Sequence, residues 1–138
     1  MADTFSFELV SPEKLLVSGQ AEMATISGVD GDMGVMANHS AVMTSLRPGL
    51  ISVKMENGNE DSYFVRGGFA DVTPEGLTVL AEYAIPRAEV TAELFAEQKR
   101  IAQEDYDAQV AAGDDEKAAN ARSYLDQLTH LEPTILPA

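Results

Sequence analysis

The chain has 138 residues, 45% of them hydrophobic, which is enough to bury the core of one ordinary domain or of one small domain with an appendage. Its 23 acidic residues outnumber nine basic ones and give a net charge of −14, which argues against binding to nucleic acids or directly to anionic lipids. Because the sequence contains no cysteine, it can form neither a disulfide framework nor a thiolate metal site.

The N-terminal sequence MADTFSFELVSPEKLL shows no targeting signal. It lacks a basic segment followed by an apolar core, and it is not Arg-rich and acid-poor as transit peptides are. Elsewhere no apolar run approaches the ~20 residues that a membrane-spanning helix needs. We therefore expect a soluble protein that stays in the compartment where it is made.

Up to about Ala84 the hydrophobic pattern favours short strands. In TFSFELV, Phe5, Phe7 and Leu9 alternate with polar residues, as they do in a half-buried strand. AEMATIS is a second candidate, and LISVKME alternates in the same way as the first.

Turn signals separate these strands. Asn57-Gly58 lies between LISVKME and DSYFVRG and predicts a hairpin, and Thr73-Pro74-Glu75-Gly76 predicts another. The adjacent glycines Gly67 and Gly68 at the start of a strand indicate a bulge or a close approach of another backbone segment. Many short strands at close spacing predict a β-sandwich or barrel.

From Arg87 onward the composition, rich in Ala, Glu and Gln, favours helices. Gly113 is expected to end the first helix, and Asp114 or Asp115 to cap the second. The expected apolar stripe of the first helix consists of Val90, Leu94, Ile101 and Ala108, broadened by Phe95, Ala102 and Tyr106. The expected inner face of the second helix consists of Ala118, Ala121, Leu125 and Leu128.

Together these patterns predict two domains. We expect a mainly β N-terminal sandwich or flattened barrel over residues 1–86. The short connection between the helices predicts a C-terminal antiparallel α-helical hairpin over residues 87–138, closed by Pro133 and Pro137.

No group of residues predicts catalysis, a metal site or a cofactor. His39 and His130 lie in different halves and have no partner at metal-ligand spacing, and no G-x-S-x-G pattern is present. The segment GVDGDMG lacks the Gly-Lys-Ser/Thr of a phosphate-binding loop, and it lacks the oxygen ligands and terminal Glu of a calcium loop. We therefore expect a non-catalytic protein.

The stretch GDMGVMANHSAVMTSLRPG, residues 31–49, carries Met33, Met36 and Met43. Methionine most often fills gaps in a core, but it also forms flexible apolar contact surfaces. The periodicity alone does not decide between these two roles.

Four motifs occur in a fixed order, within a match that runs over nearly the whole chain, and this order resembles the epsilon subunit of bacterial F-type ATP synthases of the alphaproteobacterial kind. The motifs are G-x-x-G-x-x-x-x-H, L-x-P-G, G-G-x-x-x-V and a strand of the form V-T-V-L-A. The matching residues are Gly31, Gly34 and His39; Leu46, Pro48 and Gly49; Gly67, Gly68 and Val72; and Leu77 to Ala81. The family's architecture is a β-sandwich followed by a helical hairpin, as the residue patterns predict independently.

The resemblance implies two contact regions. A loop with Gly31, Asp32, Met33 and Gly34 is expected to meet the membrane c-ring, with Asp32 facing basic groups of the ring. The implied contacts to the gamma subunit are His39, Val42, Met43 and Leu46. The family usually has prolines two residues before and two residues after the histidine. This chain has Ala37 and Ala41 there, which is expected to loosen the loop.

The implied function is that of a non-catalytic rotor subunit in the central stalk, which clamps gamma to the c-ring and couples proton flow to ATP synthesis on the alpha and beta subunits. Its implied location is the cytoplasmic face of the bacterial inner membrane, with membrane association only through the complex. The alternative is a free-standing β-sandwich that binds a sugar or a peptide. That alternative requires an aromatic-lined groove, yet only 7% of the residues are aromatic and Trp is absent.

In many members of the family the hairpin binds ATP through the motif I/L-D-x-x-R-A. The matching stretch VTAELF keeps the apolar position as Val90 but replaces the Asp and the Arg by Thr91 and Leu94. Lys99 and Arg100 remain as candidates for weak nucleotide binding. Residues 88–138 hold four basic against eleven acidic residues, a net charge of −7, which opposes docking on the acidic segment of beta that the family uses. We therefore expect a hairpin that stays folded and inhibits hydrolysis weakly.

Overall fold

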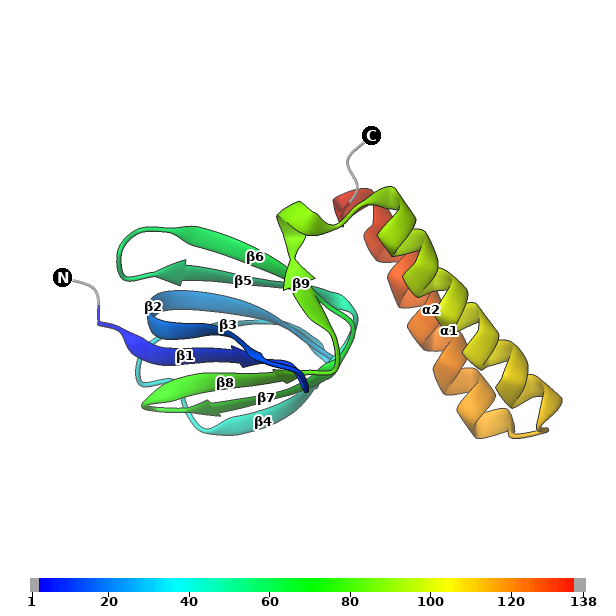
Figure 1. Cartoon of the computed structure of the whole chain (residues 1–138). Coiled ribbons are helices and arrows are strands. Elements are labelled where there is room, and N and C mark those ends of the chain that lie inside the picture. Colours follow the sequence, from blue (N-terminus) through cyan, green and yellow to red (C-terminus); the bar gives the residue numbers. More distant parts are fainter. Residues whose placement is uncertain (1–2, 136–138) are drawn as a thin grey trace. The chain divides into compact units, whose positions relative to one another are not determined.

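The computed structural model describes residues 3–135 and divides into two compact units, Met1–Ala88 and Glu89–Ala138 (Figure 1). The strands of the first unit are β1 (Phe5–Val10), β2 (Leu15–Gly28), β3 (Gly31–Val35), β4 (Val42–Leu46), β5 (Gly49–Met55), β6 (Glu60–Val65), β7 (Gly68–Thr73), β8 (Gly76–Ala81) and β9 (Ala84–Pro86). The helices that follow are the 3₁₀ turn η1 (Arg87–Glu89), α1 (Ala92–Ala111) and α2 (Asp115–Ile135). The expected fold class, a β-sandwich followed by a helical hairpin, is confirmed.

Strand β2 joins the two layers of the sandwich. Its first half pairs antiparallel with β1, from which the layer continues through β8 and β7 to β4. Its second half pairs with β3 on one side and with β5 on the other, and β6 and β9 extend that layer. The two layers face each other across the core (Figure 1).

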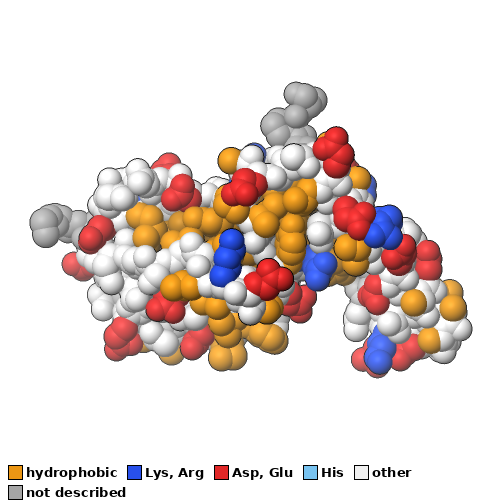
Figure 2. All heavy atoms as spheres, in the orientation of Figure 1, with side chains coloured by type: hydrophobic (Ala, Val, Ile, Leu, Met, Phe, Trp, Pro, Cys, Tyr) orange, Lys and Arg blue, Asp and Glu red, His pale blue; other side chains and the backbone are white. Residues whose placement is uncertain are grey.

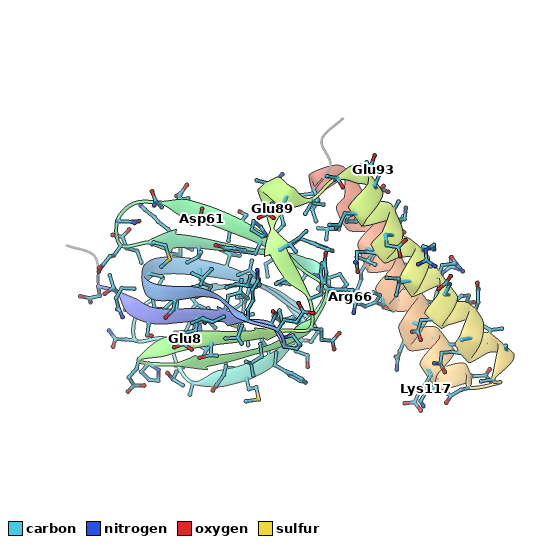
Figure 3. The ribbon with its side chains drawn as sticks, in the orientation of Figure 1. Glu8, Asp61, Arg66, Glu89, Glu93 and Lys117 are labelled. Carbon is cyan, nitrogen blue, oxygen red and sulfur yellow. The ribbon has the colours of Figure 1, made fainter. Side chains whose placement is uncertain are left out.

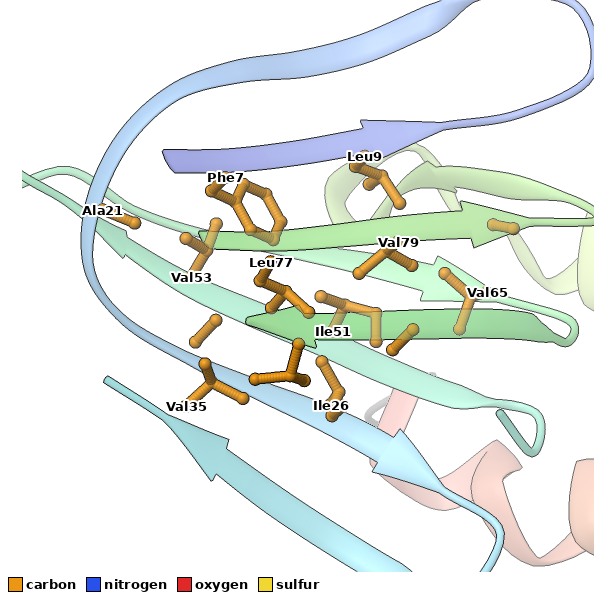
Figure 4. Close-up of a cluster of buried hydrophobic side chains, with 14 of the residues drawn as sticks. Phe7, Leu9, Ala21, Ile26, Val35, Ile51, Val53, Val65, Leu77 and Val79 are labelled. Atoms are coloured by element: carbon orange, nitrogen blue, oxygen red, sulfur yellow. The ribbon is translucent and has the colours of Figure 1, made fainter. Parts of the chain in front are cut away.

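The core of the sandwich is built from the inward residues of both layers (Figure 4). Each of the following is at most 2% exposed: Phe7, Leu9, Leu77 and Val79 from one layer, and Ile26, Ile51, Val53 and Val65 from the other. Burial of such a side chain contributes about 1.5–3 kcal/mol relative to leaving it in water. The alternation predicted for the strands at 4–10 and 50–56 therefore corresponds to the observed inward and outward faces.

Both predicted hairpin turns are confirmed. Residues Lys54 and Glu60 pair at the end of the β5–β6 hairpin, and the backbone N–H of Asn59 donates to the side chain of Asn57 at 3.0 Å. In the β7–β8 turn, the Gly76 N–H donates to the Thr73 hydroxyl oxygen at 3.1 Å. Strand β2 is longer than the predicted AEMATIS, because it starts at Leu15 and runs along β1 first.

Helix α1 begins at the cap Thr91, whose hydroxyl oxygen accepts from the Leu94 N–H at 3.0 Å. Its buried residues are Phe95, Gln98 and Ala102. The predicted stripe was wrong in its centre, since Ile101 is 39% exposed and Ala108 is also exposed. The buried face is rotated toward Phe95, and it includes a glutamine that an apolar pattern does not select.

Helix α2 follows a turn in which Gly113 has the left-handed φ of 75° that is common after a helix end. Asp114 is the cap, because its carboxylate accepts from the Lys117 N–H at 3.0 Å. The predicted inner face is confirmed, with Ala118, Ala121, Leu125 and Leu128 buried. Pro133 lies inside α2 rather than beyond it, and Pro137 lies outside the described residues.

Candidate interaction sites

The four residues expected at the c-ring form most of strand β3, not a loop. Val29 and Asp30 make the tight turn, and β3 then pairs with β2 from Gly28↔Gly31 to Ala24↔Val35. The loop expectation was wrong because two glycines hide the alternation that would signal a strand. Gly31, Asp32 and Gly34 are exposed, whereas Met33 packs partly against the sandwich core.

The side chain of Asp32 is paired within the chain. Its carboxylate is 2.5 Å from Nη2 of Arg47, a residue in the turn between β4 and β5. Nη1 of the same guanidinium donates to the carbonyl oxygen of Gly28. The Arg47 backbone N–H donates to the Ser27 carbonyl at 2.9 Å, and the Ser27 hydroxyl donates to the Arg47 carbonyl at 2.9 Å. Sequence analysis missed Arg47, since nothing in the spacing links positions 32 and 47.

His39 lies at the other end of the sandwich. Strand β3 carries the chain away from the Val29–Asp30 turn, and β4 brings it back after the loop of residues 36–41. In that loop His39 Nδ1 donates to the Ser40 carbonyl at 2.7 Å, and the Asn38 N–H donates to the Pro74 carbonyl at 3.1 Å. Asn38, at φ 65°, adopts a left-handed conformation that asparagine tolerates. These backbone contacts order a loop that lacks the family's two prolines.

The residues expected at gamma split between the two faces of β4. Met43 points outward and is 68% exposed, whereas Val42 packs partly against the core. Leu46 is only 6% exposed, so its side chain offers little surface to a partner. The alternation of β4 explains this, because residues 42, 44 and 46 share the inward face.

Met43 belongs to a larger apolar surface on the outside of the β4–β7–β8 layer. Phe69 on β7 pairs directly with Leu80 on β8, and they are 53% and 52% exposed. Met43 lies one cross-strand row further along β4, opposite Asp71. Figure 2 shows hydrophobic side chains gathered over this part of the sandwich. We call Met43, Phe69 and Leu80 the outer apolar face.

Acidic side chains occur on both layers of the sandwich. Figure 3 shows Glu8 on β1 and Asp61 on β6, which carry acidic groups on opposite layers. The chain has a net charge of −14, and other large hydrophobic residues of the sandwich, among them Leu15, Val29 and Met36, are exposed as well.

The expected nucleotide residues lie on the hairpin. Lys99 and Arg100 line an open groove of about 430 Å³ on the hairpin, together with Arg122 of α2, which sequence analysis did not include. Val90 precedes α1 and is not among the groove's lining residues. A groove with three cations has the charge that an anionic ligand requires.

Each of these cations is, however, neutralised by a neighbouring acid. Lys99 contacts Glu132 at 3.0 Å, and Arg122 contacts Asp126 at 3.1 Å. Arg100 binds Glu97 and lies 2.5 Å from Glu104. The hydrogen bond with Glu97 raises the pKa of Arg100, and the same contact lowers the pKa of Glu97.

Neither a metal-binding cluster nor a membrane-spanning helix is found in the described part of the chain. Residues 3–135 contain no cluster of three or more His, Cys, Asp or Glu side chains arranged to hold a metal ion. The helices within those residues are not long and apolar enough to cross a membrane.

Comparison with known proteins connects this arrangement to one family. Residues 4–87 match the model of the ATP synthase, Delta/Epsilon chain, beta-sandwich domain. The chain is 48% identical to the ATP synthase epsilon chain of Mesorhizobium japonicum over the full length of both. It is 50% identical to that of Parvibaculum lavamentivorans over 98% of this chain and 100% of the relative.

Solved structures of ATP synthases contain chains of similar fold. A chain in the cryo-EM structure of the Euglena gracilis mitochondrial ATP synthase, OSCP/F1/c-ring in rotational state 1, matches with a TM-score of 0.71 and 25% identity. The match covers 96% of this chain and 81% of that one. A chain from the central stalk/c-ring structure of the Tetrahymena thermophila enzyme, at 16% identity and a TM-score of 0.55 over 68% of this chain and 75% of that one, supports the fold alone.

These matches replace the alternative of a free-standing sugar- or peptide-binding module. The expectation of a non-catalytic chain is confirmed as well, because the relatives are named as epsilon chains, which are non-catalytic subunits. The chain belongs to the family of ATP synthase epsilon chains, non-catalytic subunits of the F1 part of the enzyme, which is peripheral to the membrane.

Proposed function

We propose that this chain is a rotor subunit of the central stalk that fastens the gamma subunit to the c-ring. In this role it transmits the torque of proton flow toward the catalytic sites on the alpha and beta subunits. The observation that carries the proposal is the match, over 96% of this chain, to a chain of an F1/c-ring assembly, with a TM-score of 0.71. A sandwich whose two layers share the continuous strand β2 is suited to transmit torque, because its layers cannot slide apart without breaking that strand's pairing.

The outer apolar face is the proposed gamma surface. Met43 was expected there, and Phe69 and Leu80 extend it on neighbouring strands. An exposed group of large apolar side chains is typical of a surface that a partner covers. His39, in the adjoining 36–41 loop, and the half-buried Val42 border this face in the proposal.

The β2–β3 hairpin is the proposed c-ring surface. Asp32 is 64% exposed beside the Val29–Asp30 turn, and it supplies an acidic group for basic residues of the ring. Gly31, Met33 and Gly34 flank it on β3. The location that follows is the cytoplasmic face of a bacterial inner membrane, reached only through the complex.

The helical hairpin is proposed as a weak regulator. An ATP phosphate that enters the groove must compete with Glu97, Glu104, Glu132 and Asp126 for the three cations. Each exposed pair is weak by itself, but the acids also repel the triphosphate. We therefore expect low ATP affinity and little inhibition of hydrolysis.

The substitution Asp32→Arg tests the ring surface. It reverses the charge that is proposed to face basic groups, so ATP-driven proton pumping per ATP hydrolysed should fall in membrane vesicles that hold the assembled enzyme. Asp61→Arg, which reverses an acidic residue on β6, serves as the control and should leave pumping unchanged. Equal coupling in the Asp32 variant and the parent enzyme would exclude Asp32 from the ring contact.

A further inference from the structure

Arg47 bonds to three points on the two strands of the β2–β3 hairpin. Its backbone N–H reaches Ser27 on β2, its Nη1 reaches the Gly28 carbonyl at the end of β2, and its Nη2 reaches Asp32 on β3. The Ser27 hydroxyl, on a residue only 1% exposed, returns a bond to the Arg47 carbonyl. The turn between β4 and β5 is thereby fastened to the hairpin that carries the proposed ring contact.

The ion pair alone does not explain the importance of this contact. Asp32 and Arg47 have side chains that are 64% and 29% exposed, so water and salt screen most of their attraction. The distinctive feature is that one planar guanidinium binds two acceptors on two strands at once. A lysine ammonium is a point charge on a flexible stem and does not reproduce that fork.

The hairpin has little freedom to find another arrangement. A Cβ at Gly28 would lie 2.8 Å from the Gly31 carbonyl oxygen, and one at Gly49 would lie 2.7 Å from the Ser27 Cβ. The Val29 N–H also donates to the Ser45 carbonyl at 2.9 Å, beside the Arg47 contacts. Arg47 therefore binds at the base of the turn, where the backbone at Gly28 and Gly49 is close-packed, while residues 29–32 themselves are exposed.

We propose that Arg47 is a positioning residue: it fixes the β2–β3 turn and the direction of Asp32 before any partner binds. Its significance for the c-ring rests on the proposed function, whereas its hold on the hairpin does not. The two parts can therefore be tested separately.

Hydrogen exchange in the isolated full chain tests the hold on the hairpin. In Arg47→Gln the amides of residues 29–34 should exchange about tenfold faster, because one charge-assisted contact to each strand is lost. Lys54→Gln removes a cation from the exposed Lys54–Glu22 pair on the same sandwich, and it should leave those amides unchanged. Arg47→Lys keeps the charge without the fork and should give an intermediate rate.

A charge swap supplies the result that a general structural role would not give. Arg47→Asp alone should accelerate exchange at residues 29–34, and adding Asp32→Arg should slow it again in part, because it rebuilds the ion pair in reverse but not the bond to the Gly28 carbonyl. Unchanged exchange in Arg47→Gln, or a double variant that exchanges as fast as Arg47→Asp, would overturn the proposal.

The proton-pumping assay separates this proposal from the proposed function. If exchange rises in Arg47→Gln but neither Arg47→Gln nor Asp32→Arg lowers pumping, the hairpin is held by Arg47 and the ring contact is wrong. If Asp32→Arg lowers pumping but exchange in Arg47→Gln is unchanged, the ring contact stands and the positioning role fails. The proposal expects faster exchange and lower pumping together.

Discussion

Gly68 is the glycine of the sandwich that has the closest neighbouring backbone. A Cβ on this residue would lie 2.0 Å from the Leu80 carbonyl oxygen and 2.9 Å from the Ala81 Cα, and its φ is +133°. Both the neighbouring strand and the backbone angle therefore exclude a side chain. The sequence predicted a close approach or a bulge from the Gly67-Gly68 pair, and the structure shows a close approach at the second glycine.

Gly68→Ala is expected to destabilise the sandwich by about 3 kcal/mol or more, since backbone strain and a clash with main-chain atoms add. Gly58→Ala is the matched control. Gly58 has φ +90° but has open space around its Cβ direction, so its cost should be limited to about 1–2 kcal/mol. Urea unfolding followed by circular dichroism measures both. Equal losses in the two variants would contradict the steric argument.

At the scale of elements, alternation predicted the strands that bury one face and failed for β3. Phe5, Phe7 and Leu9 all lie in the core, as their spacing indicated. In β3 the glycines leave Met33 and Val35 as the only apolar signals, and Val35 alone is fully buried. Strand β3 forms because it pairs with β2. That pairing depends on residues outside the segment, so the segment's own pattern does not reveal it.

The helices and the Arg47 contact also show where sequence patterns fail to predict the structure. The inner face of α2 could be predicted because small and apolar residues recur on it. The face of α1 was misplaced because Gln98 is buried while Ile101 is not. The Arg47–Asp32 pair joins residues 15 positions apart on either side of the 36–41 loop, so only the folded chain brings them together.

The helical hairpin of α1 and α2 gives a second prediction. Truncating the chain after Arg87 removes α1 and α2 but keeps all nine strands within the described residues. Because the hairpin's cations are paired with its own acids, its removal should change ATP hydrolysis by the assembled enzyme very little. An increase of several-fold in hydrolysis would contradict the proposal of weak regulation. Retained assembly of the truncated chain, measured by its co-purification with the enzyme, is the required control.

At the scale of the whole molecule, the distribution of surface types agrees with a chain that works inside an assembly. The chain carries a net charge of −14, while Met43, Phe69 and Leu80 leave an apolar area exposed. The proposed gamma surface and the proposed ring surface occupy different regions of one sandwich. Such a division lets one rigid unit bind two partners at the same time.

Co-purification with the gamma subunit tests the central claim most directly. When gamma and the full chain are produced together, a tag on gamma should retain the chain through size-exclusion chromatography. Phe69→Glu should abolish or strongly weaken that retention, since it places a charge in the outer apolar face. Met23→Glu, at a 43% exposed position on β2 in the other layer, should leave it intact. A parent chain that elutes alone, or a Phe69→Glu variant that is retained as well as the parent, would contradict the account.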